Sequence, residues 1–303
     1  MGRRIGLSAL CSLLATSALA APALASDVAV KQRKAEKSNV ADYWTANRIA
    51  AARPLEATRE DDGKITVRGV AKDPFGVEAP FTSGPVADSG LPPNTVNGKL
   101  YGKIRGVGPY ECSATSVDAP NRNLIFSAGH CVAEPGGSIA SKIVFIPSYE
   151  EQNRPFGTWV FERIVVLKAW KRNSNFNFDY SAVEVSPQNG VNLEDAVGGA
   201  PLALNLPVEQ TYTSVGYPSN IEEGQIMWNC VGPFAGRDPR PIPNGPLPIA
   251  MGCDMGPGAS GGGWFVNGAL NSVTSFGYKD IPDVGYGPYF GGKTGLVYNK
   301  AAN

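Results

Sequence analysis

The sequence contains a single histidine, no excess of either charge, and no long apolar run beyond its first 25 residues. Its 27 Lys and Arg residues balance its 27 Asp and Glu residues, so no net field attracts a polyanion such as nucleic acid. No later stretch has the roughly 20 consecutive apolar residues that a transmembrane helix needs. We therefore expect no nucleic-acid partner, and no membrane partner once the N-terminal segment has been removed.

The first 25 residues have the layout of a secretory signal peptide. Arg3 and Arg4 precede an apolar run from Ile5 to Ala20, and small residues lead to Ala25. The run is too short to span about 30 Å of hydrocarbon comfortably, which disfavours the alternative of a membrane anchor. The sequence predicts cleavage after Ala25 and secretion of the remaining chain.

The cysteine pattern indicates disulfides rather than a metal site. Cys11 lies within the signal, which leaves four cysteines, an even number in a chain bound for an oxidising compartment: Cys112, Cys131, Cys230 and Cys253. Four cysteines allow three pairings, and pairing of sequence neighbours would place one bridge in each half. Zinc is the alternative, but no C-x-x-C pair occurs and only one histidine is available. We predict no metal and no cofactor.

Changes in residue composition divide the chain into three segments, the first of which is the predicted signal peptide. Residues 26–95 begin with a charged, helical-looking stretch from Lys31 to Ala52 and continue with few large apolar side chains, as in a pro-region or flexible arm. From residue 96 onward, short β-branched runs are broken by glycine, proline and asparagine, which is typical of strands. These runs are 142–146, 159–167, 211–217, 225–231, 264–266 and 294–298. We predict an all-β domain over residues 96–303, with halves at about 98–187 and 207–298.

His130 is the only histidine that can serve as a general base. It lies in the sequence F-S-A-G-H-C, directly after a predicted strand from Asn123 to Ser127, and Cys131 can lock the turn. Such a turn holds an imidazole within hydrogen-bond reach of a partner. A lone histidine without this context would ordinarily be a surface or core residue; here we predict a catalytic one.

Ser260 lies in a glycine-dense turn, C-D-M-G-P-G-A-S-G-G-G-W, that starts at Cys253. Glycines so close to a serine let an acyl group approach both the hydroxyl and the backbone. We predict Ser260 as the nucleophile, with the N–H groups of Gly258 and Ser260 as the oxyanion hole. A purely structural turn is the alternative interpretation.

The order of these residues along the chain selects the type of triad. G-A-S-G-G at 258–262 matches the nucleophile elbow of α/β hydrolases, but those enzymes need a histidine after the serine and none follows here. An acid–histidine–serine order through Asp118 would need helices after the histidine, where strand patterns follow instead. The order histidine, acid, serine remains. Asp179, in F-D-Y at the mouth of a predicted strand, fits the acid best; the competing acids are Glu184, Glu194 and Asp195.

Together these motifs resemble the chymotrypsin-like (trypsin-like) serine peptidases, and within them the secreted bacterial glutamyl endopeptidase-like branch. The resemblance covers roughly residues 98–298 and rests on five motifs: C-S-A at 112–114, S-A-G-H-C at 127–131, F-D-Y at 178–180, G-A-S-G-G at 258–262 and T-S-F-G at 274–277. It implies two packed six-stranded antiparallel β-barrels with the triad in the cleft between them. It also implies the disulfides Cys112–Cys131 and Cys230–Cys253, and a backbone edge that takes the substrate as an added strand: Ser275, Phe276 and Gly277.

Two positions depart from the family pattern and a third bears on specificity. Ala259 stands where vertebrate-type members carry an aspartate that pairs with the new N-terminus, so we expect any inhibition by the pro-region to act by blocking the site or through folding. Thr274 replaces the pocket histidine of glutamyl endopeptidases, which removes the main reason to expect glutamate preference. Asp254, six residues before Ser260, matches the carboxylate that binds arginine or lysine in trypsin-like members. Cleavage after basic residues is therefore one hypothesis, and a surface role for Asp254 is the other.

The sequence predicts a secreted serine endopeptidase, made as a zymogen, that acts as a monomer on protein or peptide substrates. Two alternatives remain open. One is a catalytically inactive homologue that binds peptides or surfaces. The other is a secreted esterase that uses the same triad, although the strand edge at residues 275–277 favours peptides.

Overall fold

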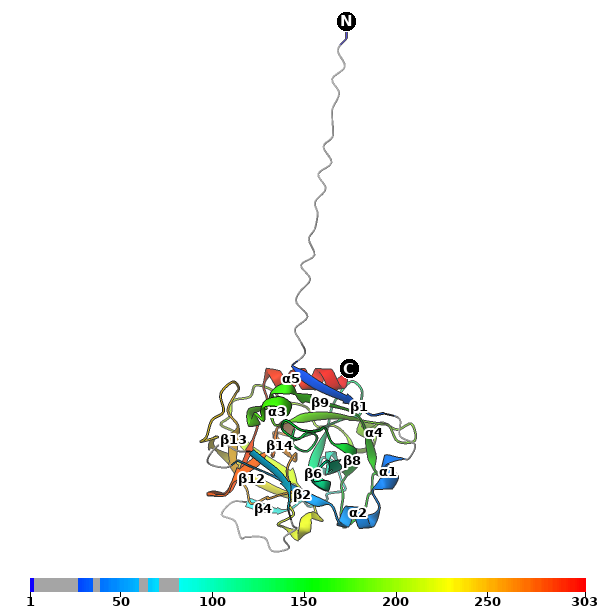
Figure 1. Cartoon of the computed structure of the whole chain (residues 1–303), viewed down its shortest axis with the longest axis vertical. Helices are drawn as coiled ribbons and strands as arrows, with labels where there is room; N and C mark the ends of the chain where they lie inside the picture. The colour runs from blue at the N-terminus through cyan, green and yellow to red at the C-terminus, as the bar shows by residue number, and fades with distance from the viewer. Residues whose placement is uncertain (3–26, 35–38, 60–64, 71–81) are drawn as a thin grey trace.

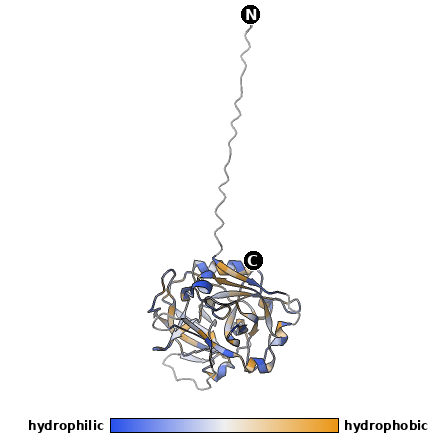
Figure 2. Ribbon diagram, in the orientation of Figure 1, coloured by the Kyte–Doolittle hydropathy of each residue, from blue (hydrophilic) through white to orange (hydrophobic). Residues whose placement is uncertain are grey.

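The computed structural model describes residues 1–2, 27–34, 39–59, 65–70 and 82–303. The predicted signal peptide therefore lies outside the described residues, apart from its first two. Among the helices that are described, none is long and apolar enough to cross a membrane. Figure 2 shows hydrophobic residues on the strands inside the body and hydrophilic residues on loops and helices at its surface.

Six antiparallel strands close into the first barrel. They pair in the order β5–β6–β7–β10–β9–β8 and back to β5. The chain order gives β5 (Asn97–Ile104), β6 (Gly108–Val117), β7 (Leu124–Ser127), β8 (Ser141–Pro147), β9 (Trp159–Leu167) and β10 (Ser181–Val185). Short helices α3 (Lys168–Asn173), η2 (Phe176–Phe178) and α4 (Leu193–Val197) join or follow these strands. The interior is filled by side chains such as Leu100, Ile125 and Val183, and this burial is the main stabilising contribution.

The second barrel is closed by a strand that changes partners halfway along. Thr274 N–H donates to the carbonyl of Gly262 at 2.8 Å, next to β14, whereas Ser275 N–H donates to the carbonyl of Tyr286 at 2.9 Å, on β17. β15 and β16 are thus the two halves of one strand. The barrel consists of β11 (Thr211–Gly216), β12 (Trp228–Arg237), β13 (Ile249–Gly252), β14 (Gly263–Val266), β15 (Ala269–Val273), β16 (Phe276–Tyr278) and β17 (Ile281–Gly287), with η3 (Glu222–Gly224) before β12. The predicted all-β architecture of two barrels is confirmed.

The described part of residues 26–95 packs against both barrels. It contains β1 (Val28–Gln32), α1 (Val40–Tyr43), α2 (Ala46–Ala50), β2 (Arg53–Arg59), β3 (Ile65–Gly69), β4 (Thr82–Pro85) and η1 (Asn94–Val96). β1 extends the first barrel beside β9, and β4 extends the second beside β12. β2 pairs with β6 of the first barrel and with β16 of the second, so it bridges the two (Figure 1).

Two predictions of local structure were wrong. Lys31 lies in strand β1 rather than in a helix, and the helical part of that stretch is two short helices. The run 294–298 belongs to helix α5 (Gly292–Ala302) rather than to a strand. Periodicity cannot separate a strand from a buried helix in so short an apolar run. The helix is favoured because Thr294, Val297 and Ala301, spaced by three and four residues, are all buried.

Candidate active site

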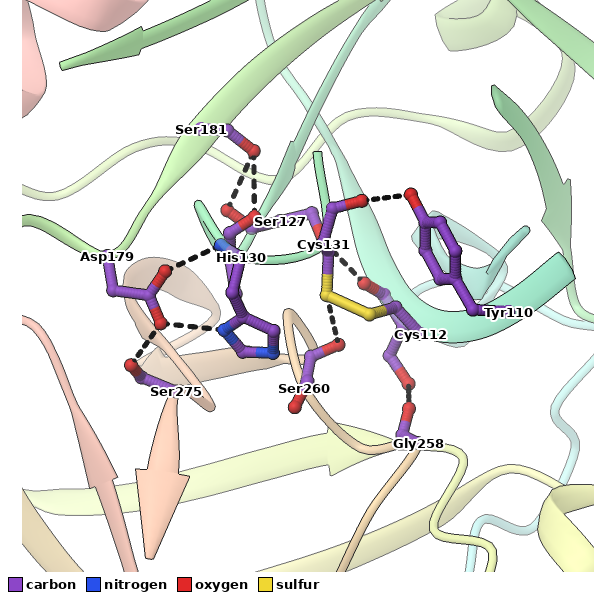
Figure 3. Close-up of a disulfide and its surroundings, with 12 residues drawn as sticks. Tyr110, Cys112, Ser127, His130, Cys131, Asp179, Ser181, Gly258, Ser260 and Ser275 are labelled. Atoms are coloured by element: carbon purple, nitrogen blue, oxygen red, sulfur yellow. Dashed lines mark hydrogen bonds and ion pairs between the residues drawn. A yellow bond between two sulfur atoms is a disulfide. The ribbon is translucent and has the colours of Figure 1, made fainter. Parts of the chain in front are cut away.

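His130 is held on the turn that follows β7 by bonds from the neighbouring strand β6. The disulfide between Cys112 and Cys131 joins this turn to β6. Tyr110 O–H donates to the carbonyl of Cys131, and Ser127 Oγ donates to the carbonyl of Ser113 at 2.8 Å. Burial raises the pKa of Tyr110 far above its usual value, so this hydroxyl stays a donor. The imidazole is therefore fixed before any substrate arrives (Figure 3).

Asp179 follows helix η2 and orients the imidazole. Its Oδ2 atom lies 2.7 Å from His130 Nδ1 and accepts a hydrogen bond from Ser275 Oγ at 2.5 Å. Its Oδ1 atom accepts the backbone N–H of His130 at 2.7 Å. His130 and Asp179 are both fully buried. This arrangement places the proton on Nδ1 and leaves Nε2 as the basic nitrogen.

Ser260 lies on the other side of the imidazole from Asp179, as Figure 3 shows. Its carbonyl accepts the N–H of Ser113 at 2.8 Å, which ties the turn after β13 to the first barrel. His130 Nε2 is buried and has no hydrogen-bond partner among the described residues, so the serine–histidine hydrogen bond is not formed in this structure. Such bonds are often long until a substrate is bound. The three residues predicted as the triad are thus brought together.

The competing acids lie elsewhere. Glu184 accepts a hydrogen bond from Arg163 at 2.9 Å, and Glu194 accepts the N–H of Ala119 at 3.4 Å. Asp195 pairs with Arg122. These contacts make all three acids part of ordinary surface or inter-strand bonding rather than partners of the imidazole.

The turn before Ser260 requires glycine at position 258. Gly258 has φ of +92°, and a Cβ atom there would lie 2.8 Å from the carbonyl oxygen of Tyr217. Its N–H donates to the carbonyl of Leu55 at 3.2 Å. The N–H of Ser260 has no acceptor among the described residues. One of the two predicted oxyanion donors is therefore already bonded to strand β2, a contact that the sequence analysis missed.

A cavity of about 260 Å³ opens beside Ser260, between residues 253–257, 274–279 and 281–285. Asp254 is one of its lining residues, but its carboxylate accepts a hydrogen bond from Ser83 Oγ at 2.9 Å and lies 3.2 Å from Cys230 Sγ. Thr274 also lines it, and its Oγ1 accepts the indole N–H of Trp264 at 2.9 Å. The remaining wall comes from β2, through residues 56–58.

The predicted substrate edge is already paired in this structure. Gly277 pairs with Thr58 of β2 in parallel register. Phe276 stacks on Tyr286 with ring centroids 5.1 Å apart, whereas the side chain of Ser275 points to Asp179. Only the pattern of alternating residues in 53–59 could have indicated a strand here, and nothing in it indicated the cleft as its place.

The cysteines pair as Cys112–Cys131 and Cys230–Cys253, as the resemblance implies. Two groups of potential metal ligands occur among the described residues, and each consists of one of these bridges with His130 or Asp254 beside it. A disulfide sulfur is not the thiolate that binds zinc. The geometry of these groups therefore fits disulfides rather than metal centres.

Comparison with known proteins identifies the family. The family model described as Trypsin matches residues 106–289, which is more than half of the chain. The chain belongs to the trypsin family. Among solved structures, a thermostable serine protease AL20 from an extremophilic microorganism is 32% identical, with a TM-score of 0.63, and the match covers 69% of this chain and 97% of that one.

Two curated relatives of this trypsin-family chain match over shorter stretches. The extracellular metalloprotease of Bacillus subtilis is 27% identical over 125 residues, which is 41% of this chain and 38% of the relative. The glutamyl endopeptidase of Bacillus licheniformis is 31% identical over 114 residues, which is 37% of this chain and 34% of the relative. The matched part thus spans little more than a third of either relative.

Proposed function

We propose that this trypsin-family protein is a serine endopeptidase that hydrolyses protein or peptide substrates through an acyl-enzyme. The observation that carries the proposal is the 2.7 Å contact between His130 Nδ1 and Asp179 Oδ2, with Ser260 beside the opposite edge of the ring. A base oriented by a buried acid and facing a serine is the arrangement that activates a hydroxyl for acyl transfer.

In the proposed cycle, Ser260 Oγ attacks the peptide carbonyl carbon and His130 Nε2 takes the hydroxyl proton. Collapse of the tetrahedral adduct breaks the C–N bond, and His130 gives the proton to the leaving amine. Water then attacks the ester, gives one proton to His130, and releases the acid while Ser260 regains a proton. Asp179 stabilises the imidazolium in both halves, and we propose that the N–H groups of Gly258 and Ser260 hold the oxyanion.

We further propose that residues 26–95 are a pro-region that blocks the site. Leu55 presents its carbonyl to Gly258 N–H, and Thr58 pairs with Gly277. The chain therefore runs along residues 275–277 in the direction opposite to a substrate whose N-terminal side pairs with that edge. A strand held backwards offers no peptide bond to Ser260 in the attacking geometry, so it inhibits without being cut.

The same segment also covers Asp254, the residue that would select basic residues at the cleavage site. Its bond to Ser83 comes from β4, which belongs to residues 26–95. Loss of that segment would free the carboxylate, and cleavage after basic residues stays a prediction. We also propose residues 1–25 as a secretion signal, with the mature protein monomeric and extracellular, where its two disulfides are stable.

The proposal is tested by digestion of a peptide library with the secreted protein after removal of residues 26–95, and with its Ser260→Ala and Ser138→Ala variants trimmed in the same way. Ser138 is a matched control because it is exposed and bonds only Glu134. We expect cuts by the parent and by Ser138→Ala, and a loss on the order of a million-fold for Ser260→Ala. A fluorophosphonate probe should label Ser260 in the parent and in Ser138→Ala, and should not label Ser260→Ala. Equal cutting by all three proteins, or cleavage of esters alone, would contradict the proposal.

A further inference from the structure

Strand β2 ends on an arginine that fills a preformed acidic site at the end of the cleft. Arg59 Nη1 lies 3.0 Å from Asp238 Oδ2 and 3.4 Å from the hydroxyl of Tyr278, and it also donates to the carbonyl of Arg240. The Asp238 side chain is fully buried, and that of Arg59 is 9% exposed. All three contacts are made by Nη1, so the site holds one end of the guanidinium as it would hold a cationic ligand.

The second barrel builds this site from its own groups. Asp238 Oδ1 accepts the hydroxyl of Tyr278 at 2.6 Å and the backbone N–H of Arg240 at 2.9 Å. These bonds fix the carboxylate in place whether or not Arg59 is present. The carboxylate is therefore preorganised, which lowers the entropic cost of binding a cation.

The neighbouring cation, Arg240, is already paired with a different carboxylate. The guanidinium of Arg240 pairs with Asp280 and lies over the ring of Tyr278, 4.3 Å from its centroid. Among the described residues, Arg59 is the only cationic side chain in ion-pair contact with Asp238. Once β2 leaves, a buried carboxylate opens onto the cleft without a counter-ion, and leaving it so is unfavourable.

We infer that Asp238, Tyr278 and the Arg240 carbonyl form a cation-binding subsite of the peptidase cleft. Arg59 occupies it in the covered form, and an arginine or lysine side chain of the substrate occupies it after β2 has left. This inference rests on the proposed peptidase function and adds a determinant of specificity to it. The subsite adjoins the cavity that Asp254 lines: Tyr278 belongs to both, whereas Asp238 lies outside that cavity.

The spacing along β2 sets the substrate position that the subsite reads. Leu55 presents its carbonyl to the proposed oxyanion donor, and Arg59 lies four residues further along the strand. At about 3.3 Å per residue, the subsite lies roughly 13 Å from the scissile carbonyl. A substrate strand of opposite direction then places its fourth or fifth residue, counted back from the scissile bond, at Asp238.

The test is a competition between two peptides in one tube. Both are built on a sequence that the library digestion shows to be cut, and they carry either arginine or its neutral isostere citrulline at the fourth or fifth position before the scissile bond. The ratio of their kcat/KM values does not depend on how much enzyme β2 still covers. To ensure turnover, the assay uses the full chain and the Arg59→Ala variant, each with and without Asp238→Asn.

When Asp238 is present, we expect kcat/KM to be about tenfold higher for the arginine peptide than for the citrulline peptide. This is the effect of a charge-assisted hydrogen bond at a partly solvent-exposed site. The preference should fall to about one with Asp238→Asn and persist with Asp195→Asn, a matched change at an exposed carboxylate. A ratio near one in the parent, or a ratio that Asp238→Asn leaves intact, overturns the subsite while leaving the peptidase proposal standing. Absence of any cut in the library overturns the peptidase proposal instead.

Discussion

At the scale of single residues, Asp179 accepts three of the hydrogen bonds that define the candidate site. It receives the backbone N–H and the Nδ1 atom of His130 as well as the hydroxyl of Ser275. All three are donors directed at a carboxylate, which has only acceptors to offer. Any change that puts a donor in this position must reverse a hydrogen bond or turn the imidazole.

We predict that Asp179→Asn lowers kcat by about four orders of magnitude, because an amide N–H beside Nδ1 favours the wrong tautomer of His130. The measurement is turnover of a peptide found in the library digestion, with circular dichroism to show that the variant is folded. Glu184→Gln and Asp195→Asn are the controls, since both acids pair with arginines away from the site. A comparable loss in either control would assign the catalytic acid differently.

At the scale of elements, we propose that β2 controls access to the cleft. The strand lies between the two barrels and bonds to both, and Leu55 is fully buried in the cluster that includes Trp170 and Phe276. If the segment exchanges between a bound and a released state, as this proposal requires, substitutions in the strand shift that equilibrium.

We predict that Leu55→Asp raises the activity of the unprocessed chain by a factor on the order of ten or more, because a buried unpaired carboxylate disfavours the covered state. The readout is the rate at which a fluorophosphonate labels Ser260, measured before any processing. Leu91→Asp is the matched control, since Leu91 lies in the same segment but is 58% exposed. No gain over that control would show that β2 does not limit access.

At the scale of the whole molecule, a buried ion pair lies where the two barrels meet. Lys99 of β5 bonds Glu111 of β6 at 2.9 Å, with both side chains fully buried, and also donates to the carbonyl of Gly224 from the second half at 2.8 Å. Three tyrosine rings surround its ammonium group at 5.0 to 5.8 Å from their centroids. The pair is thus shared between the barrels rather than internal to one.

We predict that Lys99→Met lowers the free energy of unfolding by about 3–5 kcal/mol, since it leaves Glu111 buried without its cation. The double variant Lys99→Met/Glu111→Leu should recover most of this loss, because no charge is then left buried. Urea unfolding of Ser260→Ala protein, which cannot digest itself, provides the measurement. Lys300→Met at an exposed position should change stability by less than about 0.5 kcal/mol. A double variant as unstable as the single one would contradict this explanation.

The sequence by itself determined the all-β class and the division into two halves, and it was enough to propose His130, Asp179 and Ser260 as the triad, because these inferences depend on local signals and on the order of the motifs. We can recognise these signals without the structure: a lone histidine beside a cysteine, a serine among glycines, and the order of the motifs along the chain. The helix at residues 292–302 was misjudged because a short apolar run has no decisive period.

Only the tertiary structure decided where the N-terminal segment lies. Residues 53–59 carry no motif, and their place in the cleft depends on pairing with β6 and β16, which are far away in the sequence. The same is true of Asp238, which no sequence motif marks. Its proposed role in binding a cation follows from its contacts with Arg59 and Tyr278, which are distant from it in the sequence. Long-range pairing is set by the packing of the whole chain, so a sequence read locally cannot supply it.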